Sequence, residues 1–291
     1  MRRMRAKGVS RWLGMAFLLF LCLLMGFPLL MTVTVSLETM PEIYASSPRL
    51  LPAQPQWGNY PLSMSNGNWG RYFYNSMLVT FLTTLISLVI NSMSGFVFAR
   101  IPFRGRKTVF TLVLLGMMIP PEVTLFSVFR LVRSIPFAGG NNFLGQGGRG
   151  LMNTYAGLIL PYIAGSFGVF LCRQFYLGFP RELDDAACID GCGRLAQFRL
   201  IYLPLSGPLI ASLGILKFTG TWNEYTWPLV LTTGDAMKTV QLALTSFRSE
   251  TEIQWNQMMA ATLISGLPIY LLFFFAQKYF VSGLLAGSVK G

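Results

Sequence analysis

The sequence predicts an all-α integral membrane protein with six transmembrane helices and a polar, cytoplasmic helix-turn-helix between the fourth and the fifth. Hydrophobic residues make up 53% of the 291 residues, and charged residues make up only 12%. Long uncharged runs alternate with short segments in which arginine and lysine gather. Because a helix of about 20 apolar residues crosses the roughly 30 Å hydrocarbon core of a bilayer, each of these runs predicts one span.

The first span is predicted at residues 12–37, directly after a cluster of basic residues at the N-terminus. A secretory signal peptide has an apolar core of about 7 to 15 residues and then a small-residue cleavage site, so this longer run is expected to stay in the membrane. The proline-rich stretch 38–71 is predicted to be a loop on the far side, and residues 72–99 form the second span.

The third span, residues 108–130, contains Pro120 and Pro121 in its middle. Proline removes a helical hydrogen bond and its ring clashes with the preceding turn, so this helix is predicted to be kinked or broken. A glycine-rich loop follows at residues 133–150. The remaining spans are predicted at residues 151–172, 205–231 and 255–277.

The distribution of basic residues predicts the orientation of the chain. With the N-terminus inside, most of the 23 lysine and arginine residues fall in inner segments, as the positive-inside rule requires. Residues 1–11, the polar segment 179–204 and the tail 284–291 are therefore predicted to be cytoplasmic, around a membrane domain of residues 12–283. This topology explains the net charge of +12, whereas a nucleic-acid partner needs a basic stripe on a soluble face.

The polar segment 179–204 is predicted to form a helix, a tight turn and a second helix. Pro180 suits the start of a helix, where its missing N–H has no intrahelical use. The acids that follow, Glu182, Asp184 and Asp185, lie where the helix dipole favours negative charge.

Two glycines in this segment predict where its first helix stops. Gly191 and Gly193 follow the last apolar residue of that helix, and glycine adopts backbone conformations that other residues avoid. A second helix is predicted for residues 194–202. It is expected to end before Pro204, because the residue before a proline disfavours the helical conformation.

The residue types present exclude most catalytic and metal-binding chemistry. The chain contains no histidine, which removes the usual general base and the usual metal ligand. Of its four cysteines, Cys188 and Cys192 lie in the polar segment, too few for a zinc site. Glu182 and Asp185 share a helix face at the spacing of an acid–base pair, but a charged, solvated helix start explains them better. The prediction is a chain that is not an enzyme, has no metal site, and docks a partner through its polar segment.

Glu224 is an acid within the predicted fifth span, and an ionisable residue inside a membrane indicates a function. Three interpretations remain open. Glu224 lines a cavity, or it pairs with Lys217 two helical turns earlier, or it lies at the outer interface beside Trp222 and Trp227.

The polar segment contains a motif that consists of an acid, two alanines, three further residues and a glycine, followed later in the segment by leucine and proline. The residues that form it are Asp185, Ala186, Ala187, Gly191, Leu203 and Pro204. This motif resembles the cytoplasmic signature of the integral-membrane subunits of ATP-binding-cassette importers, with aspartate where glutamate is usual.

Three further stretches narrow the resemblance to the carbohydrate-uptake group, similar to the maltose permease pair. Residues 153–161 resemble the start of the family's fourth span, and residues 222–229 resemble its fifth. The C-terminal residues 283–291 resemble the tail of the second maltose-type permease subunit, which reaches into the ATPase interface.

The resemblance implies a heterodimer with a second, homologous permease, together with two cytoplasmic ATP-binding subunits and an extracytoplasmic solute-binding protein. It implies import of a carbohydrate by ATP-driven alternating access across a bacterial or archaeal cytoplasmic (inner) membrane. The lipid bilayer is then a partner, and nucleic acid is not. No cofactor is expected on this chain; ATP and Mg²⁺ belong to the partner subunits, and the chain has no phosphate-binding Gly-Lys-Ser/Thr loop.

The resemblance also implies which residues have these roles. Coupling to the ATPase is expected at Glu182, Asp185, Ala186, Ala187, Asp190 and Gly191. A C-terminal contact with the ATPase is expected at Gly287, Ser288 and Lys290. The translocation cavity is expected at Trp222, Asn223 and Glu224. The loop 233–254 is expected to face the binding protein through Thr245, Ser246 and Phe247.

Other functions are alternatives to sugar import. The same architecture would suit a sugar acid, an oligouronide or a glycerol phosphate as the imported solute. Broken helices and an intramembrane acid also suit an ion-coupled secondary transporter, although that function leaves the polar segment unexplained. A membrane-embedded enzyme is the weakest alternative, since the sequence has no catalytic constellation.

Overall fold

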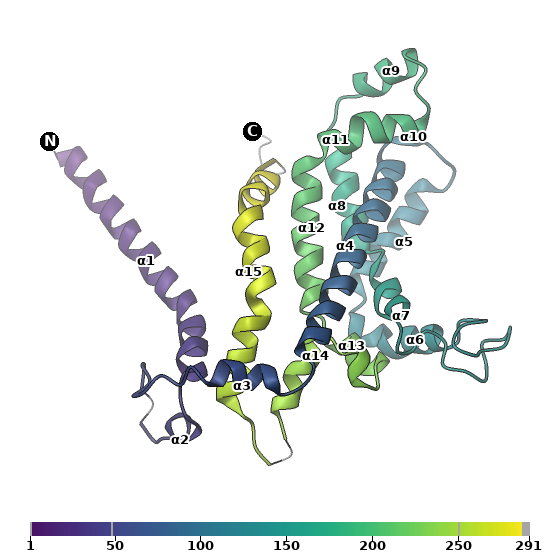
Figure 1. Ribbon diagram of the computed structural model, residues 1–291. Coiled ribbons are helices and arrows are strands. Elements are labelled where there is room, and N and C mark those ends of the chain that lie inside the picture. The colour runs from purple at the N-terminus through teal and green to yellow at the C-terminus, as the bar shows by residue number, and fades with distance from the viewer. Residues whose placement is uncertain (1, 48, 250, 287–291) are drawn as a thin grey trace. The chain divides into compact units, whose positions relative to one another are not determined.

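The structure, a computed structural model, describes residues 2–47, 49–249 and 251–286 (Figure 1). All regular secondary structure in this part of the chain is helical, apart from an isolated β-bridge between Arg248 and Ile253. The all-α prediction is therefore confirmed. The chain divides into two compact units, which are described separately.

The first unit consists of residues 1–69 and 244–267. Its helices are α1 (Arg2–Ser36), α2 (Met40–Ile43), α3 (Asn59–Ser65), η4 (Leu244–Phe247) and the beginning of α15 (Trp255–Ala286). The buried side chain of Asn59 donates to the backbone oxygens of Ser36 and Glu38 at 2.9 and 3.1 Å. The stretch 38–71, predicted as a loop, thus carries two short helices held by a buried, hydrogen-bonded amide.

The second unit consists of residues 70–243 and 268–291. Its membrane-domain helices are α4 (Trp69–Arg100), α5 (Arg106–Met118), α6 (Pro121–Arg133), α7 (Tyr155–Ile159), η1 (Leu160–Tyr162), α8 (Ser166–Leu177), α12 (Gly207–Trp222), α13 (Thr226–Leu231), η3 (Asp235–Met237) and α14 (Val240–Ala243). The polar segment contains α9 (Glu182–Ile189), α10 (Arg194–Gln197), the π-helical turn η2 (Phe198–Tyr202) and α11 (Leu203–Leu205). Helices α9, α10 and α11 lie at one end of this unit, and α6, α7 and α13 lie at the other (Figure 1).

Among the described residues, three helices are long and apolar enough to cross a membrane. They are Trp12–Ser36, Trp69–Arg100 and Trp255–Gln277. Three bent helix pairs pass the same test when each pair is taken as one span, and they are Arg106–Met118 with Pro121–Arg133, Tyr155–Tyr162 with Ser166–Leu177, and Arg194–Leu205 with Gly207–Trp222. By length and composition the described part of the chain therefore has three to six candidate spans.

Three predicted spans are interrupted, and the predicted fourth span, 151–172, bends by 45° between Tyr155–Tyr162 and Ser166–Leu177. The predicted third span bends by 107° between α5 and α6, at the two prolines where a break was expected. The predicted fifth span, 205–231, is not one helix: α12 ends at Trp222 and α13 begins at Thr226. At this break the backbone N–H of Trp227, in the first turn of α13, donates to the side chain of Glu224 at 3.0 Å, which satisfies one donor that the start of a helix leaves without an intrahelical partner.

Helices α4 and α8 approach each other closely in the second unit. A Cβ atom added at Gly95 of α4 would lie 2.4 Å from the Cβ of the fully buried Cys172 of α8. Small residues allow such an approach of two helix backbones in a membrane protein. This contact brings the C-terminal end of α4 next to the end of α8, where the polar segment begins.

Replacing Gly95 by valine is therefore expected to destabilise the protein. The added methyl groups overpack the contact with Cys172, and overpacking costs about 1 to 3 kcal/mol. The measurement is the melting temperature of the purified protein in detergent. Gly70→Val is the matched control, because Gly70 lies in the same helix and a Cβ added there would meet no atom within 4 Å. Equal melting temperatures for the two variants would contradict the prediction.

Candidate functional site

The candidate site is the polar segment at the end of the second unit. Its first helix, α9, starts at Glu182, and three acids lie in its first turn. The helix ends in a turn at Gly191, whose φ of +72° is left-handed and is strained for residues with a Cβ. The backbone N–H of Cys192 reaches back to the oxygen of Ala187 at 2.8 Å, a bond that closes helix C-termini of this type.

The second helix of the segment differs from its prediction. Helical backbone continues from Arg194 to Leu205, past Pro204, so the prediction that the helix ends before this proline is wrong. The reason is the π turn at Phe198–Tyr202. A π turn is wider than an α turn, and it moves away the carbonyl with which the proline ring would otherwise clash.

Helix α9 has one exposed face. Its members follow a spacing of three and four residues and share one side of the helix; they are Glu182, Asp185, Ala186 and Ile189. The side chain of Ile189, the large apolar member of this set, is 86% exposed. Two carboxylates and one exposed isoleucine thus lie together on a surface that this unit does not cover.

The other face of α9 is turned toward the protein. Ala187 is only 2% exposed, and Asp184 is half-buried. Of the residues predicted for coupling, Ala187 therefore lies away from the exposed face, whereas Asp190 and Gly191 are exposed at the end of the helix. The small side chain of Ala187 allows this face of α9 to pack closely against the rest of the unit.

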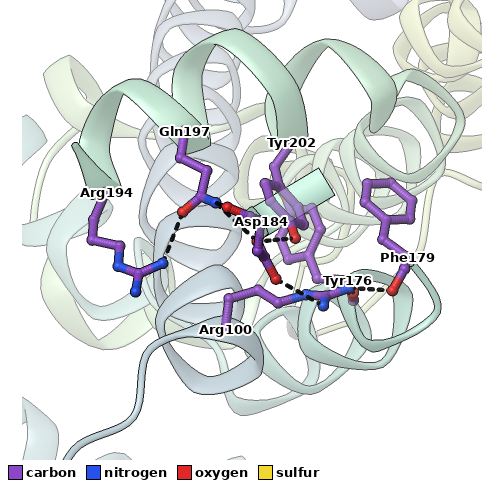
Figure 2. Close-up of polar contacts among 7 residues, drawn as sticks. All are labelled: Arg100, Tyr176, Phe179, Asp184, Arg194, Gln197 and Tyr202. Carbon is purple, nitrogen blue, oxygen red and sulfur yellow. Dashed lines mark hydrogen bonds and ion pairs between the residues drawn. The ribbon is translucent and has the colours of Figure 1, made fainter. Parts of the chain in front are cut away.

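Asp184 is the centre of a buried polar network (Figure 2). Its Oδ2 accepts a hydrogen bond from Nη1 of Arg100 at 3.1 Å, which is also an ion pair. Its Oδ1 accepts from the hydroxyl of Tyr202 at 2.6 Å and from Nε2 of Gln197 at 3.0 Å. Both carboxylate oxygens are thus bound by side chains from other elements.

Arg100 is the last residue of α4 and joins this network to the end of α8. Its Nη2 donates to the backbone oxygen of Tyr176 at 2.6 Å and also to the backbone oxygen of Phe179. Carbonyls in the last turn of a helix have no intrahelical partner, and the guanidinium binds that of Tyr176 in α8 as well as that of Phe179, just after the helix. The Arg100 side chain is 6% exposed, so its charge is almost completely removed from water.

Aromatic rings enclose the ion pair. The ring of Tyr202 stacks on Phe179 with centroids 5.4 Å apart, meets Tyr176 edge-on at 5.5 Å, and lies 5.4 Å from the guanidinium of Arg100. Arg194 donates to Oε1 of Gln197 at 3.1 Å, which turns the amide nitrogen of Gln197 toward the carboxylate. The pair is neutral as a whole and lies in surroundings of low polarity.

The sequence interpretation missed this network. In the sequence Arg100 is one of the basic residues at the end of the second apolar run, and Asp184 is one of three acids at a helix start. They are 84 residues apart in the chain. No local pattern relates residues at that separation, so only the packing of α4 against α8 brings them together.

The residues predicted for a cavity do not form one surface. Trp222 is 1% exposed and stacks on Phe218 with centroids 6.0 Å apart, which makes it a core residue. Asn223 is exposed and accepts from Nε2 of Gln241 at 3.0 Å. Glu224 is half-buried and caps α13 through the N–H of Trp227.

The proposed pairing of Glu224 with Lys217 has no counterpart in the structure. The Lys217 ammonium lies 5.6 Å from the ring centroid of Tyr162, and the ion pairs found in the described part of the chain do not include it. The structure therefore does not support the pairing of Glu224 with Lys217. It shows a local role for Glu224, which binds the backbone N–H of Trp227 at the start of α13.

In the first unit, the loop predicted to face a binding protein is partly buried. Phe247 is 1% exposed and stacks on Trp69 with centroids 6.0 Å apart, Thr245 is half-buried, and Ser246 is exposed. Phe247 therefore packs within its own unit. The predicted C-terminal contact residues Gly287, Ser288 and Lys290 lie outside the described residues.

A family model described as "Binding-protein-dependent transport system inner membrane component" matches residues 91–285 of the chain. This range includes the polar segment and both of its helices.

Two relatives are similar over almost the whole chain. The arabinooligosaccharides transport system permease protein AraQ of Bacillus subtilis (strain 168) is 33% identical over 278 residues, 94% of this chain and 94% of that protein. The trehalose/maltose transport system permease protein MalG of Thermococcus litoralis is 30% identical over 297 residues, which covers 100% of each.

The fold also resembles a solved structure. A chain in the crystal structure of a bacterial ABC transporter involved in the import of the acidic polysaccharide alginate matches with a TM-score of 0.77 and 18% identity. The match covers 95% of this chain and 98% of that one. At this identity the likeness concerns the fold alone.

Proposed function

The chain belongs to the family of binding-protein-dependent transport system inner membrane components, and we propose that it is one permease subunit of an ATP-driven importer for a sugar or an oligosaccharide. The family resemblance stated from its motifs is thereby confirmed. The substrate class is supported by the two relatives, which are named for arabinooligosaccharides and for trehalose and maltose.

The proposed architecture has six spans: three are the long helices, two are the bent pairs α5–α6 and α7–α8, and one is formed by α12 with α13. In this arrangement residues 1–11 and 284–291 are cytoplasmic, residues 12–283 form the membrane domain, and the polar segment faces the cytoplasm. The bacterial or archaeal cytoplasmic membrane is the proposed location.

The proposed partners supply what this chain lacks. A second, homologous permease completes the pathway, two cytoplasmic subunits bind ATP and Mg²⁺, and an extracytoplasmic protein delivers the solute. The family description itself names the dependence on a binding protein. No catalytic residue, cofactor or metal is proposed for this chain.

The exposed face of α9 is the observation that carries the proposed coupling. Glu182, Asp185 and Ile189 point away from their own unit. An apolar side chain one turn beyond two carboxylates suits a partner groove that has an apolar floor and a basic rim, because burying one isoleucine contributes about 1.5 to 3 kcal/mol. We propose that this groove belongs to an ATP-binding subunit.

The mechanism follows from this contact. ATP-driven closure of the two ATP-binding subunits displaces α9, and α9 transmits the movement to the ends of α4, α8 and α12. The spans then alternate between inward and outward openings. The solute is released from the binding protein toward the cytoplasm.

The test is solute uptake and ATP hydrolysis by the whole complex in proteoliposomes. The permease pair, the ATP-binding subunits and the binding protein are reconstituted together and supplied with neutral oligosaccharides, sugar acids or sn-glycerol 3-phosphate. We expect uptake that requires both ATP and the binding protein, and stimulation of ATP hydrolysis by one neutral sugar class.

Three other outcomes would change the proposal. Stimulation by a sugar acid or by glycerol phosphate would replace the solute and keep the mechanism. Uptake that follows an ion gradient without ATP would indicate a secondary transporter. No uptake of any solute by an intact complex would remove the importer proposal.

The C-terminal tail gives a further prediction. Deleting residues 286–291 is expected to change the ATP hydrolysis rate of the complex about two-fold or more while membrane insertion is unchanged, since the family tail reaches the ATPase interface. Chain ends are otherwise among the segments most tolerant of change. The measurement is the hydrolysis rate with and without binding protein. An unchanged rate would mean that the tail has no regulatory contact.

A further inference from the structure

The ion pair between Arg100 and Asp184 lies on the face of α9 opposite to the proposed docking face. We propose that these two residues form a latch that holds α9 to the ends of α4 and α8, so that the three helices move as one body. Both are positioning residues, and neither contacts the solute or ATP. The consequence for transport rests on the proposed function, whereas the latch itself is a property of this chain.

Helix α9 needs such a connection to transmit a movement. It has eight residues, and an isolated helix of that length is marginally stable in water. Short turns join it to α8 on one side and to α10 on the other. A displacement of α9 would bend these turns unless contacts between side chains held the helix in place.

Arg100 provides three directional contacts at once. Two go to backbone oxygens at the end of α8, those of Tyr176 and Phe179, and the third goes to the Asp184 carboxylate on α9. A guanidinium is a rigid planar fork, so three acceptors in different directions fix the position of each. A lysine ammonium is a point charge on a flexible chain and cannot reproduce this arrangement.

Asp184 extends the connection to the second helix of the polar segment. Its Oδ1 is held by Tyr202 and Gln197, which belong to the helical path that leads into α12. One carboxylate therefore binds elements on both sides of α9. Figure 2 shows the side chains of Arg100, Gln197 and Tyr202 converging on Asp184.

The surroundings make the latch stiff. The side chains of Arg100 and Asp184 are 6% and 19% exposed, and the rings of Tyr176, Phe179 and Tyr202 exclude water from them. A pair removed from water is screened less than a surface pair, and removing one member leaves the other charge buried without compensation. By contrast, Glu182 and Asp185 are exposed. The acids of the first turn therefore have separate roles, with Asp184 holding the helix and the other two available to a partner.

The test measures whether α9 and α4 move together. Cys188 of α9 is exposed and takes one spin label, and a second label is attached to a cysteine introduced at Met93, an exposed position of α4. Cys22 and Cys192 are replaced by serine, while Cys172 is buried and remains. Double electron–electron resonance then gives the distance distribution between the labels in the complex, without nucleotide and after trapping with ATP and vanadate.

In the protein with the unaltered latch, the distribution of distances between the two labels is expected to be narrow and not to shift on trapping with ATP and vanadate. Arg100→Gln is expected to make the distribution at least twice as wide without nucleotide and to make it shift on trapping. Arg100→Lys should resemble Arg100→Gln, since lysine lacks the planar fork. Arg104→Gln is the matched control: it removes a charge from an exposed residue four positions further on, and it should leave the distribution unchanged.

Milder variants keep the inference testable if Arg100→Gln does not insert. Tyr202→Phe retains the aromatic packing and removes one hydrogen bond to Asp184, and Asp184→Asn removes the charge with little change in shape. Both should broaden the distribution by less than Arg100→Gln. Distributions as narrow as the unaltered protein in all latch variants that insert would overturn the inference.

The functional readout separates this inference from the proposed function. In the latch variants the complex should hydrolyse ATP, but stimulation of hydrolysis by the binding protein should fall at least ten-fold. If the unaltered complex itself does not respond to ATP or binding protein, the proposed function fails. The width of the nucleotide-free distribution still decides whether the latch exists.

Discussion

Replacing Ile189 by aspartate is expected to weaken binding of the ATP-binding subunits by about 30-fold or more. The side chain is 86% exposed, so the fold of this chain loses little packing, and the new charge at the end of α9 costs only about 0.3 to 1 kcal/mol. At the centre of an interface, an apolar anchor is worth about 2 kcal/mol or more, which is a factor of about 30 in the dissociation constant.

The measurement is the dissociation constant between the permease pair in lipid nanodiscs and the ATP-binding subunits. Leu195→Asp is the matched control, because Leu195 is 60% exposed but lies on α10, away from the exposed face of α9. We expect the control to bind with nearly unchanged affinity. Equal binding of Ile189→Asp and the unaltered protein would show that the exposed face is not the contact.

Replacing Gly191 by valine is expected to reduce uptake per ATP hydrolysed by at least ten-fold while the protein still inserts. The φ of Gly191 is +72°, a conformation that costs a residue with a Cβ about 1 to 2 kcal/mol and a β-branched residue more. A Cβ at this position would meet no atom within 4 Å, so strain in the backbone, rather than a clash, is the cause. The turn is expected to rearrange and tilt α9 away from its partner.

The measurement is the ratio of solute uptake to ATP hydrolysis in proteoliposomes. Gly193→Val is the matched control, since Gly193 also lies in open space but has an extended backbone with φ of −66°, which valine adopts easily. Gly191→Asn should retain most of the coupling, because asparagine tolerates the left-handed conformation. Unchanged coupling in Gly191→Val, or an equal loss in Gly193→Val, would contradict the argument.

Several structural features of this protein could be predicted from local sequence because their causes are local. Long uncharged runs indicate helices that can cross a membrane, since the bilayer requires apolar side chains and internally bonded backbone. The prolines at 120 and 121 break the third run where they stand. The acids from Glu182 onward and the glycine at 191 mark the two ends of α9, because dipole and backbone strain act within one helical turn.

Other local expectations failed where a neighbouring element intervened. The helix continues past Pro204 because a π turn precedes it, and the run 205–231 is divided at Asn223–Tyr225, where Glu224 binds the backbone at the start of a new helix. Phe247, expected on a loop surface, is buried against Trp69, which is far from it in the chain. In each case a contact or a change of helical register outweighed the pattern of the local residues.

The sequence by itself determined the class of protein, the location of its apolar runs and the short polar helix between them. Only the tertiary structure decided which acid of that helix is free and which is bound. Asp184 and Asp185 are neighbours with the same charge, but successive side chains on a helix point about 100° apart. The close contact of α4 with α8 places Arg100 beside Asp184 and leaves Asp185 in solvent. Arg100 is 84 residues from Asp184 in the chain, so only the packing of the helices brings the two together.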